Sequence, residues 1–217
     1  MGEAVEGGGT DDLVAMAPAR VDLFGVAGEQ NAMRIVYVVD ASGSMLPVMP
    51  VIRAELRRSI ETLDASQSFQ VLAFTNGGVR TITGLSGARD GAMVRATRAN
   101  KRAVASWFDT VDAGGVGDPM GALEHALRLR PDAVFLISKR LTDTAWTAEG
   151  ARQRVDEALA RLDTLNPRDP RSGLRPASIR VVHFYDDEPW DMLRIIGETH
   201  GGESGYVFVR RGEAWAR

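Results

Sequence analysis

Two continuous apolar runs, residues 35–39 and 133–137, dominate this sequence. Both runs contain β-branched side chains and end at polar residues, as a short buried strand does. A strand that is apolar on both of its faces is typical of a parallel sheet that helices cover on each side. We therefore expect 35–39 to be a central strand and 133–137 to lie in the same buried sheet.

Between these runs, apolar residues recur at the spacing of three and four that predicts helices with one buried face. The predicted helices cover about 49–64, a segment from Thr97 to Val111, a segment that opens at Asp118-Pro119, about 147–165, and a segment around 192–196 that Gly201-Gly202 ends. Strands that alternate with helices form parallel units with right-handed crossovers. The sequence thus predicts an α/β fold, a Rossmann-like, doubly wound and mainly parallel sheet with helices on both faces.

Several shorter segments complete the predicted sheet. Residues 69–74, 179–184 and 206–209 read as strands, and 20–24 alternates as a short edge strand does. Residues 79–83 follow Asn76-Gly77-Gly78, which predicts one antiparallel edge strand closing a hairpin. We expect one domain over 19–210, after a flexible Gly-rich lead-in over 1–18 and before a C-terminal tail over 211–217.

Composition excludes several classes of function. The 26 basic residues are balanced by 29 acidic ones and mixed with them, so we expect neither nucleic acid nor an anionic membrane as a partner. The absence of cysteine removes disulfides and thiolate metal sites. No apolar run reaches the ~18 residues of a membrane helix, and the acidic, Gly-rich start is unlike a signal peptide. Localisation is therefore left open, with the cytoplasm as the default expectation.

The loop after the central strand carries the first candidate site. In such sheets, ligands bind beyond the carboxyl ends of the strands. Residues 40–44 stand there, and they combine the carboxylate of Asp40 with the hydroxyls of Ser42 and Ser44. Oxygen ligands of this kind suit Mg²⁺, but the same residues also suit an ordinary turn. The five residues alone leave both interpretations open.

The pattern Asp-x-Ser-x-Ser behind an apolar strand resembles the metal-ion adhesion motif of the von Willebrand factor type A family. Further segments over 19–210 are similar to a bacterial branch of that family: Phe24-Gly25-Val26, Tyr37-Val38-Val39-Asp40, Phe69-Gln70-Val71, Asn100-Lys101-Arg102 before Trp107, Gly114-Gly115, Asp118-Pro119 and Ala122-Leu123. The resemblance implies a site for Mg²⁺ or Mn²⁺ and a protein partner that offers a carboxylate to the ion. It implies that Ser42 and Ser44 bind the ion directly and Asp40 through a water.

Two positions depart from the family's pattern. The threonine that normally follows the Gly-Gly pair is missing, and Asp118 either supplies a carboxylate instead or caps the next helix. The aspartate that normally follows the strand at 133–137, in a Thr-Asp-Gly turn, is replaced by Lys139 in Ser138-Lys139-Arg140. Thr142-Asp143 leaves open that an inserted loop returns Asp143 to the site.

The charge at Lys139 decides what these departures do. Two unit charges about 4 Å apart interact by roughly 4 kcal/mol at an effective dielectric near 20, so a divalent ion meets about twice that repulsion. We therefore predict a degenerate site that binds no cofactor, in which Lys139 pairs with Asp40. The alternative for Lys139 is that its long side chain extends into solvent.

The expected function is non-enzymatic protein binding or scaffolding through the strand-end face of Asp40, Ser42, Ser44, Asp118 and Lys139. The alternative is a Mg²⁺-dependent, phosphatase-like hydrolase that resembles the haloacid dehalogenase phosphatases, with Asp40 as nucleophile and Lys139 as the base that neutralises its charge. Those enzymes carry a second aspartate two residues after the nucleophile, and Ser42 occupies that position here. The residues thus favour a binding module.

Overall fold

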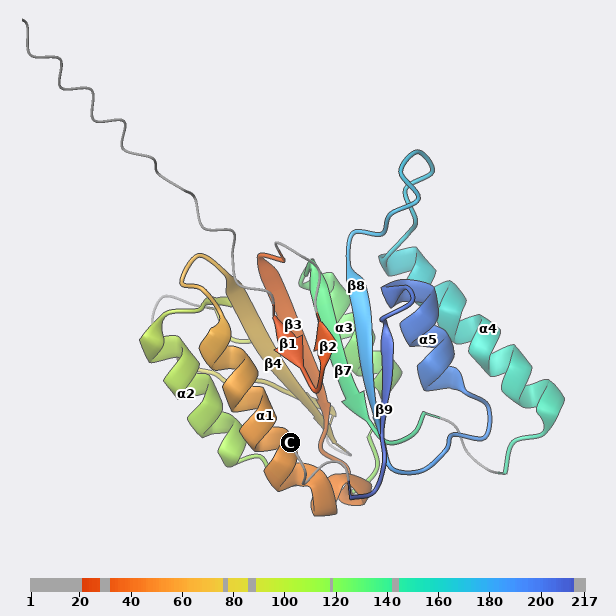
Figure 1. Ribbon diagram of the computed structural model, residues 1–217, viewed down its shortest axis with the longest axis horizontal. Coiled ribbons are helices and arrows are strands. Elements are labelled where there is room, and N and C mark those ends of the chain that lie inside the picture. Colours follow the sequence, from red (N-terminus) through yellow and green to blue (C-terminus); the bar gives the residue numbers. More distant parts are fainter. Residues whose placement is uncertain are drawn as a thin grey trace, which may run out of the picture.

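The computed structural model describes residues 21–27, 32–75, 78–85, 89–117, 119–141 and 145–212. Seven strands in this part of the chain form one sheet in the order β5-β4-β3-β7-β8-β9, and β6 pairs with β4 beside that path. The strands are β3 (Arg34–Asp40), β4 (Ser68–Thr75), β5 (Gly78–Arg80), β6 (Val94–Arg95), β7 (Ala133–Ser138), β8 (Ser178–Phe184) and β9 (Tyr206–Val209). The parallel strands run downward in Figure 1, so their carboxyl ends share its lower edge.

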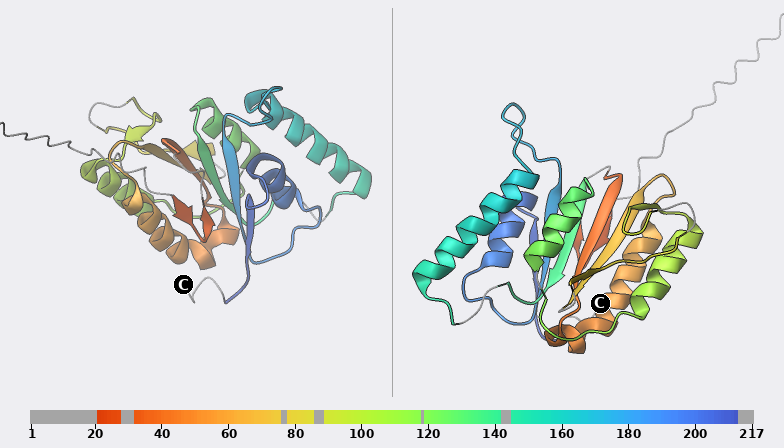
Figure 2. Two further views of the ribbon diagram at one scale, coloured as in Figure 1. Left: turned by 45° about the horizontal axis from the view of Figure 1, so that its top comes forward. Right: turned by 180° about the vertical axis from the view of Figure 1, so that it is seen from behind.

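Helices cover both faces of this sheet (Figures 1 and 2). They are α1 (Met49–Thr62), α2 (Arg98–Asp109), α3 (Pro119–Arg128), α4 (Ala148–Leu165) and α5 (Met192–Gly201). Helices α1 and α2 pack on one face, while α3, α4 and α5 pack on the other. Alternate residues of β3 enter the two cores, with Tyr37 on the α1 side and Val38 on the α3 side. The central strand is therefore buried on both faces, as its continuous apolar run predicts.

The expected α/β architecture is confirmed, with β3 at the centre of the sheet and a short antiparallel strand at one edge. That edge strand, β5, ends at Arg80 rather than at residue 83. A second antiparallel strand, β6, pairs with the start of β4 and was not predicted, because two residues carry no detectable alternation.

The prediction that 20–24 forms an edge strand is wrong. Instead, a short strand β1 (Asp22–Leu23) pairs with β2 (Val26–Ala27) in a separate, antiparallel two-stranded sheet. Phe24 and Gly25 have φ values of 52° and 80°, and this left-handed pair turns the chain back on itself. The Phe24 ring then packs edge-on against Phe184, with ring centroids 5.1 Å apart. Hydrogen bonds to β2 thus replace those that an edge strand would make to the main sheet.

Local signals set the helix boundaries. The Thr97 side chain accepts a hydrogen bond from the Asn100 N–H, and Thr147 accepts one from Gly150, so α2 and α4 start where the sequence predicts. Helix α5 ends at Gly201, and its C-cap, Gly202, has a φ of 71°. The predicted cap at Asp118, the lead-in over 1–18 and the last five residues of the tail lie outside the described residues. In the described part of the chain, no helix combines the length and apolar character needed to cross a membrane.

Candidate binding site at the carboxyl ends of the strands

A pocket of about 410 Å³ opens at the carboxyl ends of β3 and β7. It brings together three of the predicted site residues, Asp40, Ser42 and Ser44. The remaining lining residues come from the loop before α3, the first residue of α3 and the segment between β7 and α4: Gly115, Val116, Gly117, Pro119, Arg140, Leu141 and Trp146. Lys139 does not line the pocket, and Asp118 is outside the described residues.

Asp40 is held in place at the base of this pocket. Its side chain is 4% exposed. One carboxylate oxygen accepts the backbone N–H of Ser42 at 2.8 Å, and the other accepts the hydroxyl of Ser138 at 2.8 Å. Because β3 and β7 are parallel neighbours, Ser138 arrives beside Asp40 at the same edge of the sheet. The role of Ser138 was missed from the sequence, since it requires knowing which strands are adjacent.

The hydroxyls of Ser42 and Ser44 lie 3.0 Å apart on the 3₁₀ helix η1 (Gly43–Val48) and its N-cap. Neighbouring ligands of an octahedral Mg²⁺ ion, at about 2.1 Å from the metal, stand about 3 Å apart. A direct hydrogen bond between two hydroxyls has nearly the same length. The spacing of the two serines therefore suits either arrangement, and the charge of the site must decide between them.

The loop before α3 closes one side of the pocket, and backbone hydrogen bonds hold it there. The Gly114 N–H donates to the Ala41 carbonyl at 2.8 Å, and the Gly43 N–H donates to the Gly115 carbonyl at 3.0 Å. A Cβ atom on Gly117 would stand 2.4 Å from the Phe74 ring, so only glycine fits there. Val116, in the segment where the resemblance expects a threonine, is exposed and provides no hydroxyl.

The predicted ion pair between Lys139 and Asp40 is wrong. The Lys139 ammonium lies 2.7 Å from the Asp186 carboxylate, after β8, and its side chain is only 17% exposed, so it is not extended into solvent either. Successive side chains of a strand point to opposite sides, and Ser138 already faces Asp40. The hydrogen bond from Lys139, with a second one from Arg211, lowers the pKa of Asp186 to about 2. The alternative that used Asp143 lies outside the described residues.

Arg140 is the basic residue that does line the pocket. Its side chain is exposed, and no residue in the described ranges forms a hydrogen bond or ion pair with its guanidinium. The next residue is fixed, because the Leu141 N–H donates to the buried carboxylate of Glu188 at 2.6 Å. Glu188 also accepts the Leu193 N–H at 2.6 Å, which ties this turn to the start of α5. Sequence reasoning named Lys139 and missed Arg140, although both belong to the same basic turn.

The donor set fits a divalent ion poorly. The pocket supplies one carboxylate, both of whose oxygens already accept hydrogen bonds, together with two hydroxyls. The guanidinium of Arg140 cancels the formal charge of that carboxylate. Among the described residues, no group of three or more His, Cys, Asp or Glu side chains could hold a metal. The site thus offers little of the negative charge that compensates for the loss of a cation's water shell.

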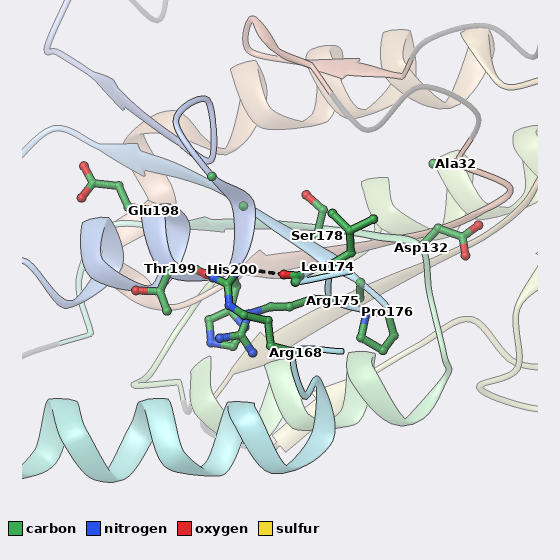
Figure 3. Close-up of a pocket in the computed structure, with 14 residues that line it drawn as sticks. Ala32, Asp132, Arg168, Leu174, Arg175, Pro176, Ser178, Glu198, Thr199 and His200 are labelled. Atoms are coloured by element: carbon green, nitrogen blue, oxygen red, sulfur yellow. Dashed lines mark hydrogen bonds between the residues drawn. The ribbon is translucent and has the colours of Figure 1, made fainter. Parts of the chain in front are cut away.

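A second cavity, of about 420 Å³, lies at the opposite, amino ends of the strands (Figure 3). Arg168, Arg175 and His200 lie side by side in it. Arg168 donates to the Gly173 carbonyl at 2.8 Å, and Arg175 donates to the Asn166 carbonyl at 2.6 Å. Burial, reinforced by the charge of Arg175, lowers the pKa of His200 to about 4. This cavity contains none of the predicted site residues.

Comparison with known proteins shows similarity in structure alone. No profile of a known protein family matches the chain, and no curated protein sequence matches it. A von Willebrand factor type A protein from Catenulispora acidiphila is 17% identical, with a TM-score of 0.56, over 85% of this chain and 39% of that one. The pilus adhesin SpaC from Lactobacillus rhamnosus GG is 11% identical, with a TM-score of 0.58, over 87% of this chain and 30% of the adhesin.

A third similar structure is proximal thread matrix protein 1 from the mussel byssus, which is 15% identical with a TM-score of 0.53. It aligns over 85% of this chain and 44% of its own length. The chain therefore spans less than half of each of these three proteins. At such low identity the similarity concerns the arrangement of helices and strands, and function has to be argued from the site.

Proposed function

We infer that this chain, which has the fold of a von Willebrand factor type A domain, is a non-enzymatic protein-binding module. Its binding surface is the strand-end pocket that contains Asp40, Ser42 and Ser44. This proposal is carried by two exposed apolar side chains beside those residues: Leu46 on η1, at 57%, and Val116 on the loop before α3, at 78%. Exposed apolar groups around a polar centre are typical of surfaces that bind proteins.

The distribution of exposed apolar residues supports this surface. Only four large apolar side chains are exposed in the described part of the chain, and two of them, Leu46 and Val116, lie at this surface. The other two, Met33 and Leu174, lie on separate loops near the amino ends of the strands. SpaC, similar in fold, is described as an adhesin, which agrees with a binding role by analogy of fold alone.

The binding mode that we propose needs no metal ion. Lys139, which pairs with Asp186, adds little repulsion at the pocket, but Arg140 lines it with a charge that no described residue neutralises. Unit charges about 4 Å apart interact by roughly 4 kcal/mol at an effective dielectric near 20, and a divalent ion doubles that figure. Solvent reduces this repulsion, because the guanidinium is exposed. However, the aspartate that the family carries after this strand is also missing, so its attraction for the ion, which would be of similar size, is lost.

The phosphatase-like alternative requires Asp40 to be a free nucleophile with Lys139 beside it. Lys139 is instead bonded to Asp186, and both Asp40 oxygens accept hydrogen bonds within the protein. Asp40 is also only 4% exposed. These contacts support a structural role for Asp40 in shaping the pocket, and therefore a binding module rather than a hydrolase.

Affinity capture with matched baits tests the proposal. Three immobilised forms of the chain would be exposed to a lysate of the organism that encodes it, in EDTA and in Mg²⁺: native, the double variant Leu46→Ser/Val116→Ser, and Leu174→Ser as a control with an equally exposed apolar residue elsewhere. We expect a protein that the native and control baits retain in both buffers and that the double variant loses.

Two outcomes of the capture experiment would contradict the proposal. Equal retention by all three baits would mean that binding occurs on another face. Retention by the native bait in Mg²⁺ alone would mean that an ion completes the site after all. Quantitative mass spectrometry of the retained proteins distinguishes these outcomes, because each bait is compared with itself in the two buffers.

A further inference from the structure

We propose that Arg140 anchors the partner by binding an acidic side chain directly, in place of a metal ion. This inference rests on the proposed function and specifies the chemistry of the partner at the same pocket. It begins with the free donors of Arg140, which lines the pocket and has no hydrogen-bonding or ion-pairing partner among the described residues. A guanidinium presents N–H groups in a planar fork whose geometry matches a carboxylate.

The turn that carries Arg140 is fixed on both sides. Ser138 donates its hydroxyl to Asp40, Lys139 pairs with Asp186, and the Leu141 N–H donates to Glu188. Within the turn 138–141, Ser138, Lys139 and Leu141 each take part in one of these contacts, and Arg140 takes part in none of them. A partner that binds it orders only this side chain, since the backbone beneath is already held, and this lowers the entropic cost of binding.

The surroundings favour an acid over a base as the group that enters. Among the residues that the structure describes, Asp40 and Arg140 are the charged ones that line the pocket. Asp40 lies buried and both of its oxygens accept hydrogen bonds, whereas Arg140 is exposed, so the more accessible of these two charges attracts a carboxylate and repels an ammonium. The exposed hydroxyl of Ser44 lines the same pocket and is a further potential donor to a carboxylate.

Apolar neighbours strengthen this pairing. Val116, Leu141 and Trp146 line the same pocket as Arg140 and give the methylene groups of an aspartate or glutamate a surface to contact. Contacts of this kind exclude water from the ion pair, which strengthens the electrostatic attraction between the two charges. The expected partner therefore presents an acidic residue next to apolar ones.

A displayed library of random peptides, selected on the native chain in EDTA and, in parallel, in Mg²⁺, tests the inference. We expect selected peptides to share an aspartate or glutamate beside apolar residues. For one such synthetic peptide, Arg140→Gln should lower the affinity by about tenfold or more, as the loss of a charged hydrogen-bonding partner does. Replacing the acidic residue of the peptide by its amide should have a similar effect, and Arg140→Lys should fall between native and Arg140→Gln.

Arg98→Gln is the matched control. Arg98 is an exposed arginine at the start of α2, close to where β6 pairs with the start of β4, and so near the opposite end of the sheet. Its substitution should leave the affinity unchanged. Circular dichroism of Arg140→Gln should match the native chain, because the replaced side chain is exposed and has no partner in the described residues.

The outcomes separate this inference from the proposed function. Peptides that need Leu46 and Val116 but carry no carboxylate, or that bind Arg140→Gln as well as the native chain, would overturn the role of Arg140 and leave the binding module standing. Peptides that bind only with Mg²⁺ would overturn the replacement of the metal. A library that yields no peptide sensitive to the Leu46→Ser/Val116→Ser variant, in either buffer, would contradict the proposed function as well.

Discussion

The two ends of the sheet carry cavities of similar size, about 410 and 420 Å³, but their arginines are used differently. At the amino ends, Arg168 and Arg175 donate to backbone carbonyls of the loop that precedes β8. At the carboxyl ends, Arg140 lines its cavity without a described partner. The guanidinium groups at the amino ends are engaged within the protein, even though the buried Nε of Arg175 has no hydrogen-bond partner, whereas that of Arg140 has no described partner at all. The difference teaches that an arginine in a cavity indicates a binding site where its guanidinium is not already engaged within the protein.

Buried polar side chains separate the two ends in the same way. At the amino ends, the side-chain amide of Asn166 forms two hydrogen bonds with the backbone of Ala177. Its Nδ2 donates to the Ala177 carbonyl at 2.8 Å, and its Oδ1 accepts the Ala177 N–H at 2.9 Å. His200 is buried beside it. At the carboxyl ends, Asp40 plays the comparable structural role, while the exposed Ser44 and Arg140 face the opening. We therefore expect substitutions at the amino ends to change stability, and those around Arg140 to change binding.

Asn166→Ala should produce the largest loss of stability. It leaves the buried N–H and carbonyl of Ala177 without partners, and unsatisfied groups of this kind together cost about 3 kcal/mol. Urea denaturation at neutral pH measures the change, with Arg140→Gln as the paired variant at the other end. Arg140→Gln should leave the free energy of unfolding within about 0.5 kcal/mol of native. Similar losses for the two variants would break the contrast between the ends.

His200 should make the amino-end cluster sensitive to acid. Its pKa is lowered to about 4 in the folded chain, from the usual 6.5, so the unfolded chain takes up the proton first. Stability from the neutral histidine is complete above pH 6.5 and is lost as pH falls towards 4; the loss between pH 7.5 and 4.5 is roughly 2 to 3 kcal/mol. Denaturation of native and His200→Gln chains over this range should show a steeper decline for native, and parallel curves would refute the assignment.

Lys139→Met should have the smallest effect of the three. Its partner Asp186 is 47% exposed and retains Arg211, so solvent screening limits the stabilisation from the pair to less than about 1 kcal/mol. Because Lys139 lowers the pKa of Asp186, the difference between native and variant should be present above pH 4 and should diminish as pH falls towards 2. Thermal denaturation at pH 6 and pH 3 checks this, and a loss above 2 kcal/mol would show that Lys139 is essential to the turn.

Much of the fold could be predicted from local patterns. The apolar run at 35–39 required a strand buried on both faces, and the central strand β3 has that position. Thr97 and Thr147 marked helix starts because their hydroxyls satisfy N–H groups only a few residues away. The hairpin of β1 and β2 was missed, since it depends on a left-handed Phe24 whose strain the packing against Phe184 offsets.

The sequence by itself determined that Asp40, Ser42 and Ser44 stand at the end of the central strand, because periodicity and loop composition are local properties. Only the tertiary structure decided how the charges around them are paired. Ser138 reaches Asp40 because β3 and β7 are neighbours, and Lys139 consequently points to Asp186, while Arg140 is left facing the pocket. Which side chains meet across a sheet depends on the order of the strands and on how their side chains alternate against those of neighbouring strands. Both depend on segments that are far apart in the sequence, so no single segment determines them.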